Sequence, residues 1–119
     1  MKYYAFFTLL LIGCYSCTST ETSHQEEWIA IFNGKDLSDW IIKFANQDLN
    51  FNHRNTFRAQ DSMIRIAYNQ YDSFNDAYAH MYYKTPYSYY KLRFDYRFTG
   101  EQVKGGEDWN VRNSGIMLH

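Results

Sequence analysis

Hydrophobic and polar residues alternate most regularly in residues 89–99. The apolar positions are Tyr90, Leu92, Phe94, Tyr96 and Phe98, and the polar positions are Lys91, Arg93, Asp95, Arg97 and Thr99. Because successive side chains of a strand point to opposite faces, this period of two predicts a strand with one aromatic and one charged face. The charged face is a candidate binding surface.

Shorter apolar runs predict further strands on both sides of this segment. They cover residues 28–32, 41–44, 56–59, 63–68, 77–85 and 116–119. Asn33-Gly34 is a strong turn pair, Pro86 ends one run, and the Asn-rich residues 45–55 are typical of a loop. No segment has a sustained helical period of 3.6. Six or seven short strands at intervals of roughly 8–12 residues predict an all-β sandwich or barrel.

The first residues have the pattern of a targeting signal. Met1-Lys2 precedes an apolar run over residues 3–12, which is too short for a spanning helix of about 20 residues and fits a signal-peptide core. The run ends in Leu11-Ile12-Gly13-Cys14, which resembles the lipobox of bacterial lipoproteins. The resemblance implies that residues 1–13 are a signal peptide and that Cys14 carries lipid. The alternative is an ordinary secretory signal in which Cys14 is incidental.

A polar stretch separates this signal from the rest of the chain. Residues 18–27 lack large apolar side chains, so we expect residues 14–27 to form a flexible tether and residues 28–119 to form the domain. Together with the lipobox, this predicts a protein of the bacterial cell envelope, on the periplasmic side or the outer-membrane surface. Its only membrane contact would be the lipid anchor.

Composition excludes several classes of function. Both cysteines lie before residue 18, so the body has neither a disulfide framework nor a thiolate metal site. The net charge of −1 gives no basic field for nucleic acid. No cofactor motif is present, and the isolated histidines support no metal site, which leaves metal dependence open.

Two stretches resemble one family. Residues 32–40, FNGKDLSDW, resemble the opening motif of the 3-keto-disaccharide hydrolase family, and residues 90–97, YKLRFDYR, followed by Asn113-Ser114-Gly115-Ile116, resemble its central block. The resemblance implies a concanavalin-like jelly-roll β-sandwich, of which this chain would be the N-terminal half, with an acidic strand beyond His119. About ninety residues would also make a thin core for a complete sandwich.

The resemblance implies a lipid-anchored hydrolase that acts on a carbohydrate, cleaving 3-keto-glycosides or related disaccharides. A non-catalytic carbohydrate-binding module on the same sandwich and a structural envelope lipoprotein remain alternatives. We expect the chain by itself to be poorly folded and inactive.

Six residues are candidates for the chemistry of such a site. Arg93, Asp95 and Arg97 would stand about 7 Å apart on one face and could bind sugar hydroxyls; the alternative is a solvated face with cross-strand ion pairs. Trp109 could cap a sugar ring. The remaining candidates, Asn113 and His119, would share one face of the last strand and of residues 113–115, which lead into it.

His119 is the only visible group of suitable pKa for a catalytic base. It could equally be a histidine satisfied by an aspartate such as Asp95. Many members of the family have an arginine at this position, so the role of His119 stays open.

Overall fold

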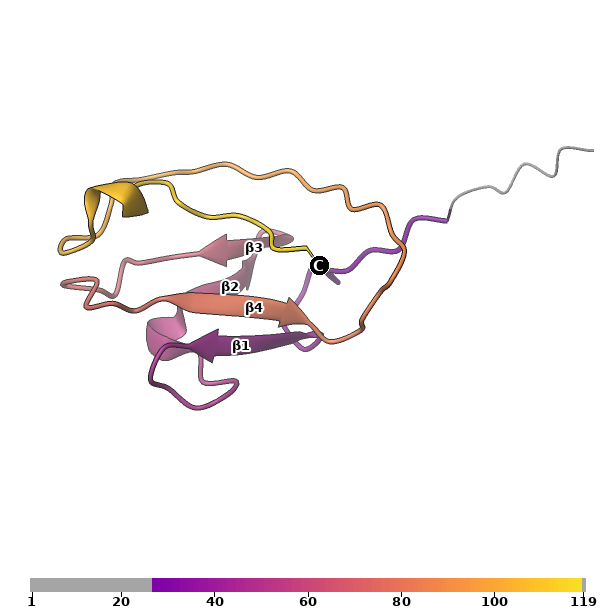
Figure 1. Cartoon of the computed structure of the whole chain (residues 1–119), viewed down its shortest axis with the longest axis horizontal. Helices are drawn as coiled ribbons and strands as arrows, with labels where there is room; N and C mark the ends of the chain where they lie inside the picture. Colours follow the sequence, from indigo (N-terminus) through magenta and orange to yellow (C-terminus); the bar gives the residue numbers. More distant parts are fainter. Residues whose placement is uncertain (1–26, 119) are drawn as a thin grey trace, which may run out of the picture.

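The computed structural model describes residues 27–118 as two small antiparallel sheets joined by loops (Figure 1). β1 (Trp40–Phe44) pairs with β4 (Ala79–Tyr83), and β2 (Phe57–Gln60) pairs with β3 (Met63–Ile66). Two short 3₁₀ turns, η1 (His53–Asn55) and η2 (Asp108–Asn110), are the only helical elements in this part of the chain. The all-β class predicted from the sequence is confirmed.

The core lies where the two sheets meet. The β1–β4 register sets Ile42 opposite Met81 and Phe44 opposite Ala79, so these side chains share one face of the sheet. Phe57 of β2 completes the cluster, with its ring centroid 5.6 Å from that of Phe44. Phe44 is only 1% exposed, which makes it the centre of this packing.

Asparagine side chains order the loop between β1 and β2 by imitating a backbone partner. Asn50 donates its N–H to the Ile42 carbonyl at 2.8 Å and accepts the Ile42 N–H at 3.2 Å through its side-chain oxygen. Asn52 makes both bonds through its side-chain amide: Nδ2 donates to the Phe57 carbonyl at 2.6 Å, and Oδ1 accepts the Phe57 N–H at 3.0 Å. These amides satisfy strand-edge groups that would otherwise lack partners, and they fix η1 against the core.

The turn predicted at Asn33-Gly34 is confirmed. The Asn33 side-chain oxygen accepts the N–H groups of Lys35 and Asp36 at 2.8 and 3.0 Å, which is an Asx-type turn. Gly34 has a φ of +76°, a conformation that glycine adopts without steric cost. The turn holds the FNGKDLSDW stretch in a tight arc before β1.

Four of the predicted strands are found, with ends that differ by one or two residues from the prediction. The runs 41–44, 56–59, 63–68 and 77–85 correspond to β1, β2, β3 and β4. Residues 28–32 do not form a strand: Trp28 and Ile29 are exposed and find no backbone partner among the described residues. The apolar pattern was correct, but a strand requires a neighbour for its ladder.

The strand predicted at residues 89–99 is likewise wrong for this structure. Figure 1 shows this stretch as a long trace that is joined through the turn at η2 to a second trace outside the sheets, residues 111–118, running back. The strand expected from residue 116 is also not formed up to residue 118. Within residues 27–118 no strand supplies the hydrogen bonds that either stretch would need.

The aromatic alternation in residues 89–99 nevertheless has a structural counterpart. The ring centroids of Phe94 and Tyr96 lie 5.7 Å apart, and those of Tyr96 and Phe98 lie 5.6 Å apart. The aromatic set therefore shares one side of the segment, as the period of two predicts.

Several predictions fall outside the described residues. They are the signal peptide over residues 1–13, lipid on Cys14, nearly all of the tether, and the position of His119. In the part that the structure does describe, no helix has the length and apolar character to cross a membrane.

Candidate functional site

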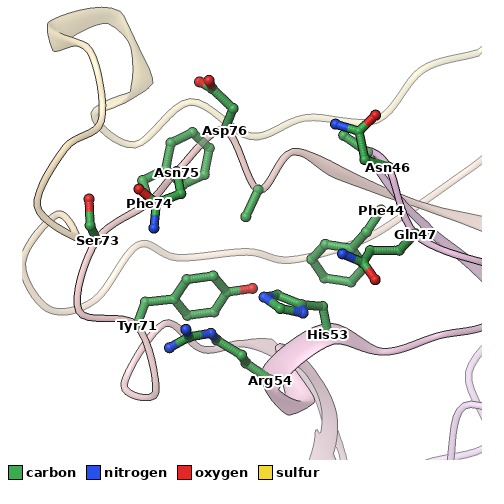
Figure 2. Close-up of a pocket in the computed structure, with 12 residues that line it drawn as sticks. Phe44, Asn46, Gln47, His53, Arg54, Tyr71, Ser73, Phe74, Asn75 and Asp76 are labelled. Atoms are coloured by element: carbon green, nitrogen blue, oxygen red, sulfur yellow. The ribbon is translucent and has the colours of Figure 1, made fainter.

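A polar pocket of about 150 Å³ opens beside the core (Figure 2). Its walls come from the turn after β1, from η1, and from the loop that precedes β4. The residues that line it are Phe44, Ala45, Asn46, Gln47, His53, Arg54, Tyr71, Ser73, Phe74, Asn75, Asp76 and Ala77. Aromatic rings and neutral amide groups make up much of this lining.

Contacts with neighbouring aromatic rings hold the His53 side chain in the pocket wall. Its imidazole lies 5.9 Å from the Phe44 ring, 5.7 Å from the Tyr71 ring and 6.1 Å from the Phe51 ring, measured between centroids. Among residues 27–118, no group hydrogen-bonds to its ring nitrogens. Packing thus fixes the orientation of the imidazole and leaves its polar edge available.

Two hydrogen bonds through the Thr56 hydroxyl fix the Tyr71 side chain, and the donor in each can be assigned. The Thr56 hydroxyl donates its single proton to the His53 carbonyl at 2.6 Å, so the Tyr71 hydroxyl must be the donor in its 2.7 Å contact with Thr56 Oγ1. Thr56 is 1% exposed, so water does not compete with either bond. Tyr71 is consequently a fixed wall of the pocket.

Arg54 braces the same ring. Its guanidinium carbon lies 5.3 Å from the Tyr71 centroid, it donates to the Gln70 carbonyl, and it lies 4.0 Å from an Asp72 oxygen. Figure 2 shows Arg54 and Phe74 on opposite sides of the Tyr71 ring. The guanidinium is therefore engaged by the protein itself.

Tyr68, which packs against Tyr71, has a shifted pKa. The pKa of Tyr68 is raised, first because burial disfavours the phenolate and second because Tyr71 lies nearby. Its ring centroid is 5.3 Å from that of Tyr71. Tyr68 therefore stays in its neutral form to a higher pH than a free tyrosine side chain.

The loop at residues 71–77 is fixed by a second loop. The Phe74 N–H donates to the Lys104 carbonyl at 2.7 Å, and the Ser73 hydroxyl donates to the same carbonyl at 3.3 Å. Asn75 and Asp76 adopt φ values of +48° and +53°, which asparagine and aspartate tolerate better than most residues. Loop 100–112 therefore supports one wall of the pocket.

Trp109 forms an exposed aromatic platform on that second loop. Its indole lies parallel to the Tyr78 ring, with 6.0 Å between centroids and 1° between planes, and it is 61% exposed. Asn110 Nδ2 donates to the Tyr78 hydroxyl at 3.3 Å. Tyr78 in turn contacts Phe74 at 4.8 Å, so the platform is joined by ring contacts to the pocket wall.

One family model matches most of the chain. Residues 27–119 match the family model described as the 3-keto-alpha-glucoside-1,2-lyase-like domain. The chain belongs to this family. The family resemblance of residues 32–40, 90–97 and 113–116 is thereby confirmed. No curated protein and no solved structure matches this chain.

The structure does not bring the predicted site residues together. Arg93, Asp95 and Arg97 are exposed on residues 89–99, which form no strand; none of the three makes an ion pair within residues 27–118, and none lines the pocket. Asn113 is exposed, and its N–H donates to the Asn110 carbonyl at 3.2 Å. Trp109 alone among these residues lies in a built aromatic arrangement.

The sequence does not predict the pocket. His53 is an isolated histidine without metal-ligand spacing, and the Asn-rich residues 45–55 are typical of a loop. The density of asparagines was the available signal, since asparagine can replace backbone partners and hold a loop in a defined shape. No cluster of three potential metal ligands occurs in the part of the chain that the structure describes.

Proposed function

We propose that this protein acts on glycosides and cleaves 3-keto-glycosides or related disaccharides. The supporting observation is the match of residues 27–119 to the 3-keto-alpha-glucoside-1,2-lyase-like domain. We further propose that the protein works in the bacterial cell envelope, anchored through lipid on Cys14.

The proposed reaction uses the acidity that a ketone gives to its neighbouring carbon. A base removes the proton on C2 of a 3-keto-glycoside, the electron pair forms the C1–C2 double bond, and the C1–O bond to the aglycone breaks. The aglycone leaves as an alcohol after taking a proton. Addition of water across the double bond completes a hydrolysis. A positioned base typically contributes about 10²–10⁴-fold to such a step.

His119 is the proposed base, and the exposed row Arg93, Asp95 and Arg97 is proposed to bind sugar hydroxyls. The two guanidinium groups can each donate paired hydrogen bonds, and the carboxylate between them can accept from hydroxyls. Trp109 offers the flat apolar surface on which the C–H face of a sugar packs.

Release of free 3-keto-sugar from 3-keto-trehalose tests this function. We expect product from the full-length wild-type protein, at least about 100-fold less from His119→Asn, and unchanged release from His80→Asn, whose side chain is on β4. Wild-type protein that releases no product would overturn the enzyme proposal.

A carbohydrate-binding module is the second candidate function. The observation that favours it is the parallel stack of Trp109 on Tyr78, because an aromatic platform binds sugar without any acid–base pair. Ligand binding without product release in the same assay would support this candidate.

A further inference from the structure

We propose that the pocket bounded by His53, Tyr71 and Phe74 seats one neutral pyranose ring. The site is separate from the Arg93, Asp95 and Arg97 row. The choice of a sugar as ligand rests on the proposed function, whereas the choice of this pocket rests on its geometry.

The size of the pocket fits a single six-membered ring. Its volume is about 150 Å³, and cavities of about this volume hold one benzene molecule in other proteins. A pyranose has the same six-membered ring, and its outward hydroxyl groups would extend beyond the pocket. A nucleotide or an intact disaccharide is larger than this space. The pocket would therefore hold one ring and leave the remainder of a longer glycan outside.

The lining has the two surfaces that a pyranose presents. Tyr71 and Phe74 give an aromatic wall for the C–H face of the ring. Gln47 and Asn75 give amide groups, each with one acceptor and two donors, which suit hydroxyls that both donate and accept. Within residues 27–118, the side chains of these two residues make no hydrogen bond to the protein. Both amides are thus available to a ligand.

His53 adds the best-positioned polar group. Three aromatic contacts fix its ring, and its nitrogens have no partner among the described residues. Gln47 and Asn75 both line the pocket, and Figure 2 shows them on opposite sides of it. Hydrogen-bonding groups therefore flank the aromatic wall on two sides.

The charges in the pocket favour a neutral ligand over an anion. Arg54 donates to the Gln70 carbonyl, lies over Tyr71 and is 4.0 Å from an Asp72 oxygen. Asp76 adds a negative charge to the lining. A carboxylate ligand would meet an engaged cation and an additional anion, so a sugar acid should bind less well than its neutral counterpart.

The test uses methyl α-D-glucopyranoside as the probe in an NMR titration and in calorimetry. We expect shift changes concentrated in residues 44–47, 53–54 and 71–77. His53→Phe keeps the ring packing and removes both nitrogens, and should weaken binding at least about ten-fold. His80→Phe is the matched control, because the His80 ring contacts Tyr82 at 6.2 Å on β4 and does not line the pocket. It should bind like wild type.

A second pair of variants distinguishes a loss of binding from a loss of folding. Gln47→Ala keeps the backbone bonds of the turn and should weaken binding several-fold, whereas Gln60→Ala at the end of β2 should not. Wild-type affinity in both His53→Phe and Gln47→Ala would overturn the proposal, as would shift changes confined to residues 93–97 or 109. Equal or tighter binding of methyl α-D-glucuronide would overturn the assignment of a neutral ligand.

The outcomes separate this inference from the proposed function. Probe binding in the pocket without turnover of 3-keto-trehalose would overturn the enzyme proposal and retain the ring-binding site. Normal turnover with no shift changes in the pocket would retain the enzyme and overturn the site.

Discussion

The indole of Trp109 lies parallel to the ring of Tyr78, with 1° between the planes and 6.0 Å between the centroids. The two residues are far apart in sequence and are joined by the docking of loop 100–112 onto residues 73–78. The two rings are parallel and offset, and Trp109 remains 61% exposed. The outer face is thereby fixed in orientation for a partner.

Replacing Trp109 tests whether this platform binds sugar. Trp109→Ala should weaken glycan binding by about 0.5–1.5 kcal/mol, because a stacked aromatic contact is lost. Trp28→Ala is a matched control, since Trp28 is 60% exposed and makes no comparable stack within the described residues. Isothermal calorimetry with trehalose would measure both. Equal losses in the two variants would contradict a specific role for Trp109.

Three glycines test how loop 100–112 is held against the pocket wall. A Cβ at Gly105 would overlap Ser73 Oγ, and this glycine has a φ of +76°. Gly105→Ala should therefore destabilise the fold by about 1–2 kcal/mol or more. Gly100 has a φ of +75° with open space around it, so Gly100→Ala should show the backbone cost alone. Gly115→Ala meets nothing within 4 Å and should be neutral. Urea denaturation gives the three values, and equal effects at positions 105 and 100 would contradict the docking.

The directed bond from Tyr71 to Thr56 makes a prediction for stability. Thr56→Val keeps the shape of the side chain but leaves the Tyr71 hydroxyl without its buried acceptor, so it should cost about 1–3 kcal/mol. Tyr71→Phe leaves the Thr56 bond to the His53 carbonyl intact and should cost less, about 0.5–1.5 kcal/mol. The exposed Thr99→Val serves as the control. A loss from Tyr71→Phe that exceeds the loss from Thr56→Val would contradict the assigned direction.

The Asx turn makes a prediction for acid pH. The Ser38 hydroxyl, the Asn33 amide and the Ser38 N–H bond to the Asp36 carboxylate and lower its pKa from 3.8 to about 2. Because the folded state holds the ionised form, the unfolded state binds more protons between these values. This contribution to stability is complete above pH 3.8 and is lost as the pH falls towards 2.

Asp36→Asn should flatten that part of the pH profile of the denaturation midpoint, while Asp48→Asn in the following loop should leave it in place. A profile of Asp36→Asn identical to that of wild type between pH 4 and pH 2 would show that the turn does not act in this way.

The proposed lipid anchor is tested by metabolic labelling with a fatty-acid analogue in a bacterial host. Label should attach to the wild-type protein and to Cys17→Ser, and it should be lost from Cys14→Ser. Label retained in Cys14→Ser would show that the Leu11-Ile12-Gly13-Cys14 stretch is not a lipobox.

Local sequence signals predicted those parts of the fold whose partners are near in sequence. The β2–β3 hairpin needs only the turn at Asp61-Ser62, and both residues adopt positive φ values there. Asn33-Gly34 likewise forms its turn from its own side chain. These elements depend on turn chemistry and alternation, which a sequence displays directly.

Pairing over longer distances could not be predicted in the same way. Residues 89–99 have a cleaner alternation than β1, yet β1 forms a strand because residues 79–83 lie beside it. Alternation shows which faces a strand would have, but a ladder also needs a neighbour. The sequence does not predict the pocket for a related reason. The pocket walls come from three segments that the sequence does not mark as neighbours.

One series of ring contacts runs from the core to the exposed platform. In spatial order it comprises Phe57, Phe44, His53, Tyr71, Tyr68, Phe74, Tyr78 and Trp109. Tyrosines that absorb ultraviolet light near a tryptophan pass their excitation to it, so Trp109 collects energy absorbed at Tyr71, Tyr68 and Tyr78. A ligand that moves the pocket wall should therefore change the emission of Trp109. Once the emission of Trp28 and Trp40 is removed by substitution, Trp109 is expected to report on the pocket without an added dye.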